Sequence, residues 1–567
     1  MSRTQSVAWY KLNSSTSTRS STSRLARVLF RSYAISNRTT LLVRCDVQEA
    51  RTGQLTSLIR DNDAKIKPSG TSRLDYHWRL HIASIAIVFI ASRLLAFAIG
   101  LRYASGEAAH SWQLLDLNIL HDHLLRGIFY LHAQPPLFNT LFGVAEKLSG
   151  SHFGDILFAL QLCLGLGAAI AVYLTLTQLN VAATVTISTV LLLVLNPAAI
   201  LYEFDPLYTE LVYALHCFIA LAAVCYIRRQ SRTALWGMAG LAVSLTLLRS
   251  SYQPIWLVLL VAVLYWGLPG SRRRIVTAGV AGLLLTLIWP TKNYILFHHF
   301  ASSTWAPFSM SRHWKYPADR KRIEPWVQQG LVPTFAPRPS ESGSTEKEFP
   351  AWLAQKWPSP RTGVPGLDNT AKDNGWTNWN SLSLLRMHDA EAQDVHFLLR
   401  HDPKSYVVNI ARGLAIYFEP STIYFKGVGG NSLVQYDKIA PVDRVMSRVC
   451  CNIFGLPPEA YGPLPPQKLR LKNFCVGAVF IYGITLACLL SLASASFWAG
   501  SRERMVAAAF LLTTILYSFL LTSLVEVGEN MRFRFETQAL AMMVAAIFLQ
   551  QLWDRRTSTR NSSASLT

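Results

Sequence analysis

Long apolar runs, separated by short basic segments, constrain this sequence more than any other feature. A helix needs about 20 predominantly apolar residues to cross a bilayer, and several runs approach that length. Of the 567 residues, 51% are hydrophobic and only 15% are charged, whereas soluble domains carry roughly a quarter charged residues. The sequence therefore predicts an all-α polytopic membrane protein with about ten transmembrane helices.

The expected spans form two groups. The first lies near 80–101, 153–179, 182–202, 207–227, 234–248, 255–268 and 275–297. The second lies near 474–498, 505–524 and 537–553. Only two of the three apolar segments between Pro135 and Tyr202 can cross fully, and the short segment 135–148 begins with a double proline. We expect that segment to be re-entrant or strongly tilted.

The net charge of +21 is distributed as in a membrane protein. Basic residues border the spans at Arg228, Arg229, Arg232, Arg272, Arg273, Arg274, Arg502, Arg504, Arg555 and Arg556. Lys and Arg beside spans stay cytoplasmic, which places the loops near 102–134, 203–208, 249–252, 298–472 and 526–535 outside. No basic face with interleaved aromatics, the mark of nucleic-acid binding, occurs in a soluble segment.

Five regions follow from these boundaries. Residues 1–75 are expected to be a disordered basic tail, with a targeting presequence or a misplaced start as alternatives, because Ser, Thr and Arg dominate it. Residues 76–300 form the N-terminal transmembrane module with the first outer loop, 102–136. Residues 298–472 form a large, irregular, tryptophan-rich outer loop with a helix expected at 405–417. Residues 473–553 hold the last spans, and 554–567 a cytoplasmic tail.

The first outer loop carries the densest group of polar side chains that could act chemically. They are Asp116, His121, Asp122, His123, His132 and Gln134. On a helix His121 and His123 point about 200° apart, so they cannot share a metal ion, whereas Asp116 and His123 share a face. The alternative is a solvated loop helix with ordinary polar residues. The sequence calls for no cofactor with certainty and leaves a divalent cation open.

Acidic residues follow a proline-interrupted span at Glu203, Asp205 and Glu210. Acidic side chains at membrane depth are costly unless they line a wet cavity, although Glu203 and Asp205 could instead cap the next helix. Arg249, at the outer mouth of another span, is a candidate partner for Asp205 or Glu210.

The last outer loop combines arginines with glutamates at a membrane boundary. Its charged residues are Glu526, Glu529, Arg532, Arg534 and Glu536. Arginine outside the membrane runs against the positive-inside trend. Binding of a lipid phosphate would explain it, because the guanidinium fork matches phosphate oxygens; local pairing with the glutamates is the alternative.

In their order along the chain these motifs resemble the bacterial protein-mannosyltransferase and lipid A aminoarabinose-transferase families of GT-C glycosyltransferases. The matching elements are Asp116, Tyr130, His132 and Gln134-Pro135-Pro136-Leu137, then Asp205 or Glu210, then ENMRFRF at Glu529–Phe535. The resemblance covers the membrane core, about residues 80–300 and 475–550.

The resemblance implies inverting transfer of a sugar from a polyprenyl-phosphate donor to a glycan, lipid or protein acceptor. It implies Asp116 or Asp122 as the catalytic base, and Arg532, Arg534 and Arg249 as the donor phosphate site. The cavity would be lined by His132, Gln134, Glu203, Asp205, Glu210 and Glu529. The enzyme would lie in a bacterial inner membrane with its catalytic side extracytoplasmic.

Two other functions fit a chain of this class. A transporter or flippase would show internal repeats and paired broken spans, but no second half of this sequence resembles the first. An O-antigen ligase or polymerase also uses an outer loop with Arg and His, and it consumes diphosphate-linked oligosaccharides.

Overall fold

The computed structural model describes residues 71–339, 348–428, 430–449 and 475–564. The chain divides into two units, Met1–Ser72 and Arg73–Thr567. Nearly all of the first unit, including the expected basic tail, lies outside the described residues. The helices and contacts below therefore belong to the second unit.

Within the described residues, six helices are long and apolar enough to cross a membrane. They are α3 (Thr71–Ala98), α7 (Phe153–Gln178), α10 (Thr209–Arg229), α13 (Arg272–Phe297), α23 (Arg502–Val525) and α24 (Asn530–Ala564). A bent pair of helices makes a seventh candidate, α8 (Ala183–Val194) with α9 (Pro197–Glu203). Three shorter apolar helices are α11 (Arg232–Leu248), α12 (Pro254–Gly267) and α22 (Val476–Ser491). These elements coincide one for one with the expected spans, and the fold is all-α.

The bend between α8 and α9 measures 52° and has a local cause in the sequence. Proline disfavours helical backbone at the residue before it, and Asn196 is extended there with φ −64° and ψ 119°. The Asn196 side chain then caps α9 by accepting a hydrogen bond from the backbone N–H of Ala198. The expected interruption at Asn196–Pro197 is thus confirmed.

The segment 135–148 forms α6 (Pro136–Ser149), which is not among the candidate spans. Pro136 occupies its first turn, where a missing N–H costs nothing. One face of α6 is buried through Phe138 and Phe142, whereas Leu148 is exposed. Of the three apolar segments in this region, α7 and the α8–α9 pair are therefore the candidate spans, and α6 is not.

Helix α10 is the centre of the membrane core, since it packs against α7, α11 and α24. Small residues let these helices approach closely: a side chain on Gly165 of α7 would collide with Glu203 of α9. Glu203 in turn receives the Nε–H of Arg93 from α3 at 2.7 Å, and a second guanidinium nitrogen of Arg93 contacts its other oxygen. This buried bidentate pair joins α3 to α9.

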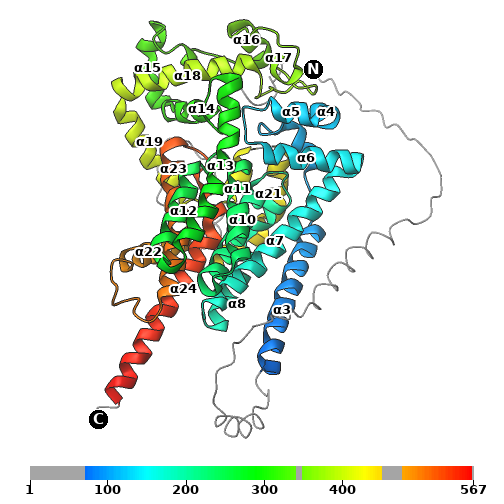
Figure 1. Ribbon diagram of the computed structural model, residues 1–567. Coiled ribbons are helices and arrows are strands. Elements are labelled where there is room, and N and C mark those ends of the chain that lie inside the picture. The colour runs from blue at the N-terminus through cyan, green and yellow to red at the C-terminus, as the bar shows by residue number, and fades with distance from the viewer. Residues whose placement is uncertain (1–70, 340–347, 429, 450–474, 565–567) are drawn as a thin grey trace, which may run out of the picture. The chain divides into compact units, whose positions relative to one another are not determined.

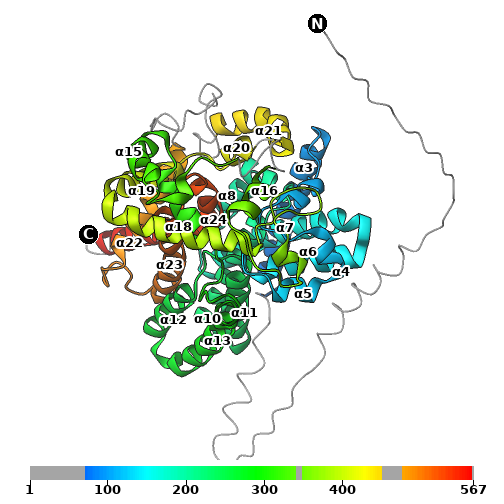
Figure 2. The ribbon, with the colours of Figure 1, turned by 90° about the horizontal axis from the view of Figure 1, so that it is seen from above.

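The loops expected outside gather at one end of the helix bundle (Figure 1). The first loop contributes α4 (Leu117–Asp122), α5 (Leu124–Phe129) and α6. The large loop contributes α14 (Ala306–Ser311), α15 (Pro317–Gln328), α16 (Glu348–Lys356), α17 (Pro365–Asp368) and α18 (Leu382–His401), followed by α19 (Pro403–Tyr417), α20 (Ile423–Val428) and α21 (Gly430–Val449). Seen from above, α16 lies over the region of α7, and α18 crosses the end of the bundle near α24 (Figure 2).

The large loop contains more helix than the sequence predicted, and its tryptophans explain why it folds. Trp379 and Phe308 are buried in one small core, against which Trp112 of the first loop and Trp305 are packed. Trp314 is fully buried in a second core. These indole rings therefore serve mainly as the hydrophobic core of the loop.

Candidate functional site

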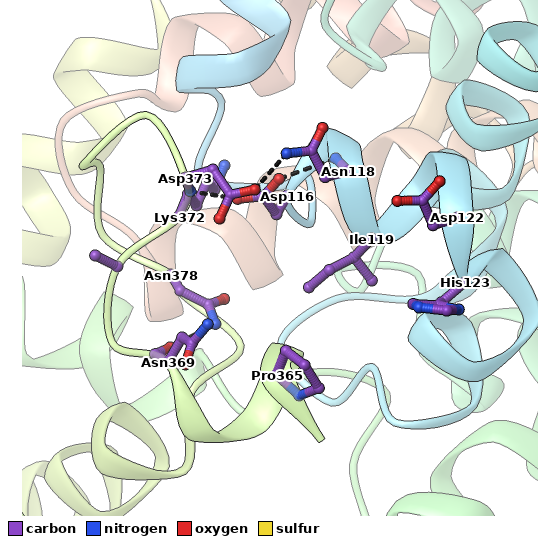
Figure 3. Close-up of a pocket in the computed structure, with 11 residues that line it drawn as sticks. Asp116, Asn118, Ile119, Asp122, His123, Pro365, Asn369, Lys372, Asp373 and Asn378 are labelled. Atoms are coloured by element: carbon purple, nitrogen blue, oxygen red, sulfur yellow. Dashed lines mark hydrogen bonds between the residues drawn. The ribbon is translucent and has the colours of Figure 1, made fainter. Parts of the chain in front are cut away.

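A pocket of about 180 Å³ opens between the first outer loop and the large loop. Its lining residues are Asp116, Asn118, Ile119, Asp122, His123, Pro365, Asn369, Ala371, Lys372, Asp373 and Asn378. Figure 3 shows Asp116, Asn118 and Asp373 together on one side of it, with Asp122 and His123 on the other. Both aspartates expected to be catalytic thus face the same space, and so does His123.

Asp116 is held by two backbone N–H groups from different parts of the chain. One carboxylate oxygen accepts from Asn118 at 2.9 Å and so caps α4. The other accepts from Asp373 of the large loop at 2.5 Å. A carboxylate has about four acceptor positions on its two oxygens, so capacity remains for a proton donor in the pocket.

Asp122 differs from Asp116 in exposure and in its partner. It lies at the C-terminal end of α4, mostly exposed, and its carboxylate contacts the ring of His121 at 2.8 Å. This hydrogen bond lowers the pKa of Asp122 and raises that of His121. Among the described residues, no group of three or more His, Cys, Asp or Glu side chains could hold a metal ion.

A second polar cluster lies where α10 and α24 begin and α11 ends. Arg249 forms an ion pair of 2.6 Å with Glu536, not with Asp205 or Glu210 as the sequence suggested. Arg532 pairs with Glu529 at 3.0 Å. The guanidinium groups of Arg249 and Arg532 both lie over the rings of Tyr208 and Phe533. We call Arg249, Arg532, Glu529 and Glu536 the arginine cluster.

The large loop adds a third arginine beside the arginine cluster. Arg312 binds Glu526 at 2.7 Å and lies 3.7 Å from Glu529. Burial opposes the charge of Glu529, but Arg532 and Arg312 hold its pKa below the ordinary value. Glu529 is therefore ionised, and Arg532 and Arg312 share its carboxylate. An anion that binds these arginines would either displace this carboxylate or lie beside it.

Asp205 lies on the same side of the bundle, close to the arginine cluster. It interacts electrostatically with Tyr202 and Tyr424, and the hydroxyl of Tyr424 accepts a hydrogen bond of 3.1 Å from Arg532. The side chain of Gln161 in α7 donates a hydrogen bond of 2.9 Å to the backbone carbonyl of Asp205. Helix α10 begins at Thr209, so Asp205 does not cap it.

Two predicted cavity residues have partners that give them a structural role. Glu203 is held by Arg93 inside the bundle, so its expected place in a substrate cavity is not what the contacts show. His132 is buried between the hydroxyl of Thr304 and the carbonyl of Asn380, each 3.0 Å away. Burial lowers the pKa of His132 to about 3, so its ring is neutral and ties the first loop to the large one.

Arg534 makes different contacts from Arg532, although both are expected at the donor phosphate site. Residues two apart on a helix point about 200° apart. The guanidinium of Arg534 accordingly donates to Ser421 at 3.0 Å and to the carbonyl of Glu419 at 3.1 Å. It fastens α24 to the segment before α20.

Two further predicted cavity residues, Gln134 and Glu210, are buried away from the described pocket. Gln134 lies directly before the double proline that starts α6, with its side chain buried. Glu210 is in the first turn of α10, and neither of its carboxylate oxygens has a hydrogen-bond partner among the described residues. It lies near the Arg93–Glu203 pair, with which it interacts electrostatically.

Aromatic contacts link the two clusters. Phe138, in the first turn of α6, packs edge-on against Tyr208 with ring centroids 5.2 Å apart. The next residue, Asn139, accepts a hydrogen bond of 2.8 Å from the backbone of Leu115, directly before Asp116. The start of α6 therefore contacts both the segment that carries Asp116 and the Tyr208 ring over which Arg249 and Arg532 lie.

Sequence reasoning missed Lys372, Asp373, Arg312 and Arg93. Arg93 carried a usable signal, because a charged residue within an apolar span marks a buried pair or a functional site. The run Asp373-Asn374-Gly375 is a turn signal, but nothing in the sequence says that this turn meets Asp116.

No family model and no curated protein sequence matches this chain. Among solved structures it is similar to the Archaeoglobus fulgidus oligosaccharyltransferase tethered with an acceptor peptide (12% identity, TM-score 0.34, 83% of this chain and 50% of that one). It is similar to archaeal oligosaccharyltransferase AglB from Archaeoglobus fulgidus in complex with an inhibitory peptide and a dolichol-phosphate (12% identity, TM-score 0.37, 85% of this chain and 52% of that one). It is also similar to ArnT from Cupriavidus metallidurans in the apo state (12% identity, TM-score 0.27, 82% of this chain and 78% of that one). The chain spans about half the length of the oligosaccharyltransferases it matches.

Proposed function

We propose that this protein is a membrane glycosyltransferase that moves a sugar from a polyprenyl-phosphate donor to a lipid, glycan or protein acceptor on the extracytoplasmic face. One observation carries the proposal. A pocket with an oriented carboxylate, Asp116, and a buried pair of arginines, Arg249 and Arg532, lie at the same end of an apolar helix bundle. A base and a phosphate site are the two parts that such a reaction needs.

The chemistry assigns one role to each part. The Asp116 carboxylate takes the proton of the acceptor hydroxyl while the acceptor oxygen attacks the anomeric carbon. The bond between that carbon and the phosphate oxygen breaks, and the polyprenyl phosphate leaves with the bonding electrons. Arg249 and Arg532 stabilise the charge that develops on the phosphate. Attack opposite the leaving group inverts the anomeric centre.

Asp205 and Glu529 are the remaining cavity residues that suit the donor, because Glu529 belongs to the arginine cluster and Asp205 lies beside it. Glu529 orients Arg532 and Arg312 until the phosphate arrives. Asp205 lies near the hydroxyls of Tyr202 and Tyr424 and suits hydrogen bonding to sugar hydroxyls. Asp122, at the opposite wall of the pocket from Asp116, is the second candidate base.

The substitution Asp116→Asn tests the proposal. Asn caps a helix about as well as Asp, so the variant keeps α4 but loses the base, and we expect transfer to fall by roughly 10²–10⁴-fold with expression and membrane insertion unchanged. The measurement is sugar transfer from a synthetic polyprenyl-phosphate hexose in proteoliposomes.

Asp155→Asn is the matched control, since Asp155 is an exposed acidic residue in the first turn of α7, and it should keep full activity. Full transfer by Asp116→Asn together with loss in Asp122→Asn would move the base to Asp122. Full transfer by both variants would refute the assignment, and turnover of only diphosphate-linked oligosaccharides would favour a ligase or polymerase.

A further inference from the structure

A hairpin of the large loop closes directly on the segment that carries Asp116. Residues 371–377 form a tight turn: Ala371 bridges Thr377, and the N–H of Lys372 donates to the carbonyl of Trp376 at 2.7 Å. Gly375 has φ +88°, a backbone conformation that favours glycine. We call this turn the 371–377 hairpin.

Several contacts fix this hairpin to the first outer loop, more than 250 residues earlier in the chain. The side chain of Asn374 donates to the carbonyl of Ala109 at 3.1 Å. Trp376 packs against His110 in a tilted arrangement with ring centroids 4.7 Å apart. The Asp373 side chain accepts a hydrogen bond from Asn118 while its backbone N–H donates to Asp116. The hairpin therefore contacts the carboxylate of Asp116 through a backbone N–H group and not through a long side chain.

Lys372 brings a positive charge into the same place. Its side chain is almost fully buried, and its ammonium donates to the carbonyls of Ser111 at 2.7 Å and Ala109 at 3.3 Å. Burial lowers the pKa of Lys372 to about 8, and the charge of Asp116 acts in the opposite direction. Lys372 is thus charged at neutral pH, and the carboxylate of Asp116 is the nearby anion that compensates this charge.

We propose that the 371–377 hairpin is the positioning element of the catalytic base, with Lys372 as its positioning residue. This inference rests on the proposed function of Asp116. The Asp373 N–H fixes the orientation of the carboxylate, and the Lys372 ammonium holds the hairpin to the carbonyls of Ser111 and Ala109, shortly before Asp116 in the chain. The large loop thereby completes the active site of the first loop.

The substitution Lys372→Met tests the charge while keeping the length of the side chain. Without the ammonium the hairpin loses its hydrogen bonds to the carbonyls of Ser111 and Ala109, so the base is held less precisely. We expect kcat to fall by roughly tenfold, with the KM for the donor unchanged because the phosphate binds elsewhere. The wild-type profile should also fall as pH rises through about 8, where Lys372 loses its proton, and Lys372→Met should lack that limb.

Other ionisable groups face Asp116 and require controls. Asp122 and His123 belong to the first loop, and Asp373 belongs to the hairpin. Lys356→Met removes an exposed lysine of the same large loop and should leave the profile unchanged. Lys372→Arg should restore most of the wild-type kcat and should lack the limb near pH 8. A lower kcat in Lys372→Met that keeps the limb near pH 8 would show a structural role only and would overturn the inference.

A second measurement separates this inference from the proposed function. Thermal unfolding of the full chain in detergent is compared for wild type, Lys372→Met, Asp116→Asn and the double variant. If the two charges interact, the double variant loses less stability than the sum of the single variants. Additive losses would overturn the inference whatever the protein does. Absence of sugar transfer by the wild type, with coupling present, would instead refute the proposed function alone.

Discussion

At the scale of single residues, the two arginines of the last outer loop show how much depends on helix geometry. Arg532 and Arg534 form one motif in the sequence, but on α24 they point to different neighbours. Arg532 belongs to the arginine cluster, where it pairs with Glu529. Arg534 supports the connection before α20.

We expect Arg532→Gln to weaken donor binding more than Arg534→Gln does. A hydrogen bond to a charged group contributes about 1.5–3 kcal/mol, so loss of one arginine–phosphate contact should raise the KM for the polyprenyl-phosphate donor by roughly 10–100-fold. Arg534→Gln should lower thermal stability with little change in that KM. The measurement is donor titration in proteoliposomes, and equal KM values for the two variants would remove Arg532 from the phosphate site.

At the scale of elements, the packing of α18 against the 3₁₀ turn η5 (Pro333–Phe335) holds the outer half of the large loop together. Asp394 of α18 accepts two hydrogen bonds from Thr334, one from the backbone at 2.8 Å and one from the hydroxyl at 2.5 Å. The neighbouring Glu391 is fully buried on the same helix face. Burial raises the pKa of Asp394 to about 6 despite the hydrogen bonds.

This shift predicts a pH dependence with a defined sign. Because the folded pKa of Asp394, about 6, exceeds its ordinary value of 3.8, the folded loop binds the proton more tightly than the unfolded chain. The stabilisation is therefore fully present below pH 3.8 and is lost as pH rises through about 6. We expect the melting temperature to fall over this interval for the wild type and to vary less for Asp394→Asn. A melting temperature in Asp394→Asn that falls as steeply as in the wild type would contradict the assignment.

At the scale of the whole membrane unit, the two ends of the helix bundle differ: one carries the outer loops and the other carries arginine-rich connections. Helix α4, which Asp116 caps, lies at one end of the bundle with α16, α17 and α18 of the large loop (Figure 1). The connections rich in arginine lie at the other end, where Arg228 pairs with Glu503 and Arg504 with Asp554. This separation agrees with the positive-inside rule, which keeps Lys and Arg beside spans on the cytoplasmic side.

Accessibility of single cysteines tests this topology. Four exposed positions suit the test: His121→Cys and Arg361→Cys at the pocket end, and Arg229→Cys and Arg273→Cys at the other. In intact cells, a membrane-impermeant thiol reagent should label the first two, and it should label the last two only after permeabilisation. Labelling of all four in intact cells, or the reverse pattern, would contradict the extracytoplasmic site.

Local sequence signals account for what could be predicted at each scale. Apolar length predicted every span, Asn196–Pro197 predicted the bend, and the double proline predicted the start of α6, because each depends on neighbouring residues only. The partners of Arg249 and Asp116 could not be predicted in this way. Glu536 and Asp373 lie more than 250 positions away in the chain, and only the packing of α24 and of the large loop brings them close.

The length of α24 has a consequence for how a lipid substrate is reached. Arg532 lies 23 positions before Arg555, which corresponds to about 35 Å of helix. A bilayer is about 40–45 Å across with its headgroups included. Under the proposed function, this length puts Arg532 near the headgroups of one leaflet when Arg555 and Arg556 lie at the cytoplasmic surface, so that the phosphate of a lipid-linked sugar would be bound without leaving its leaflet.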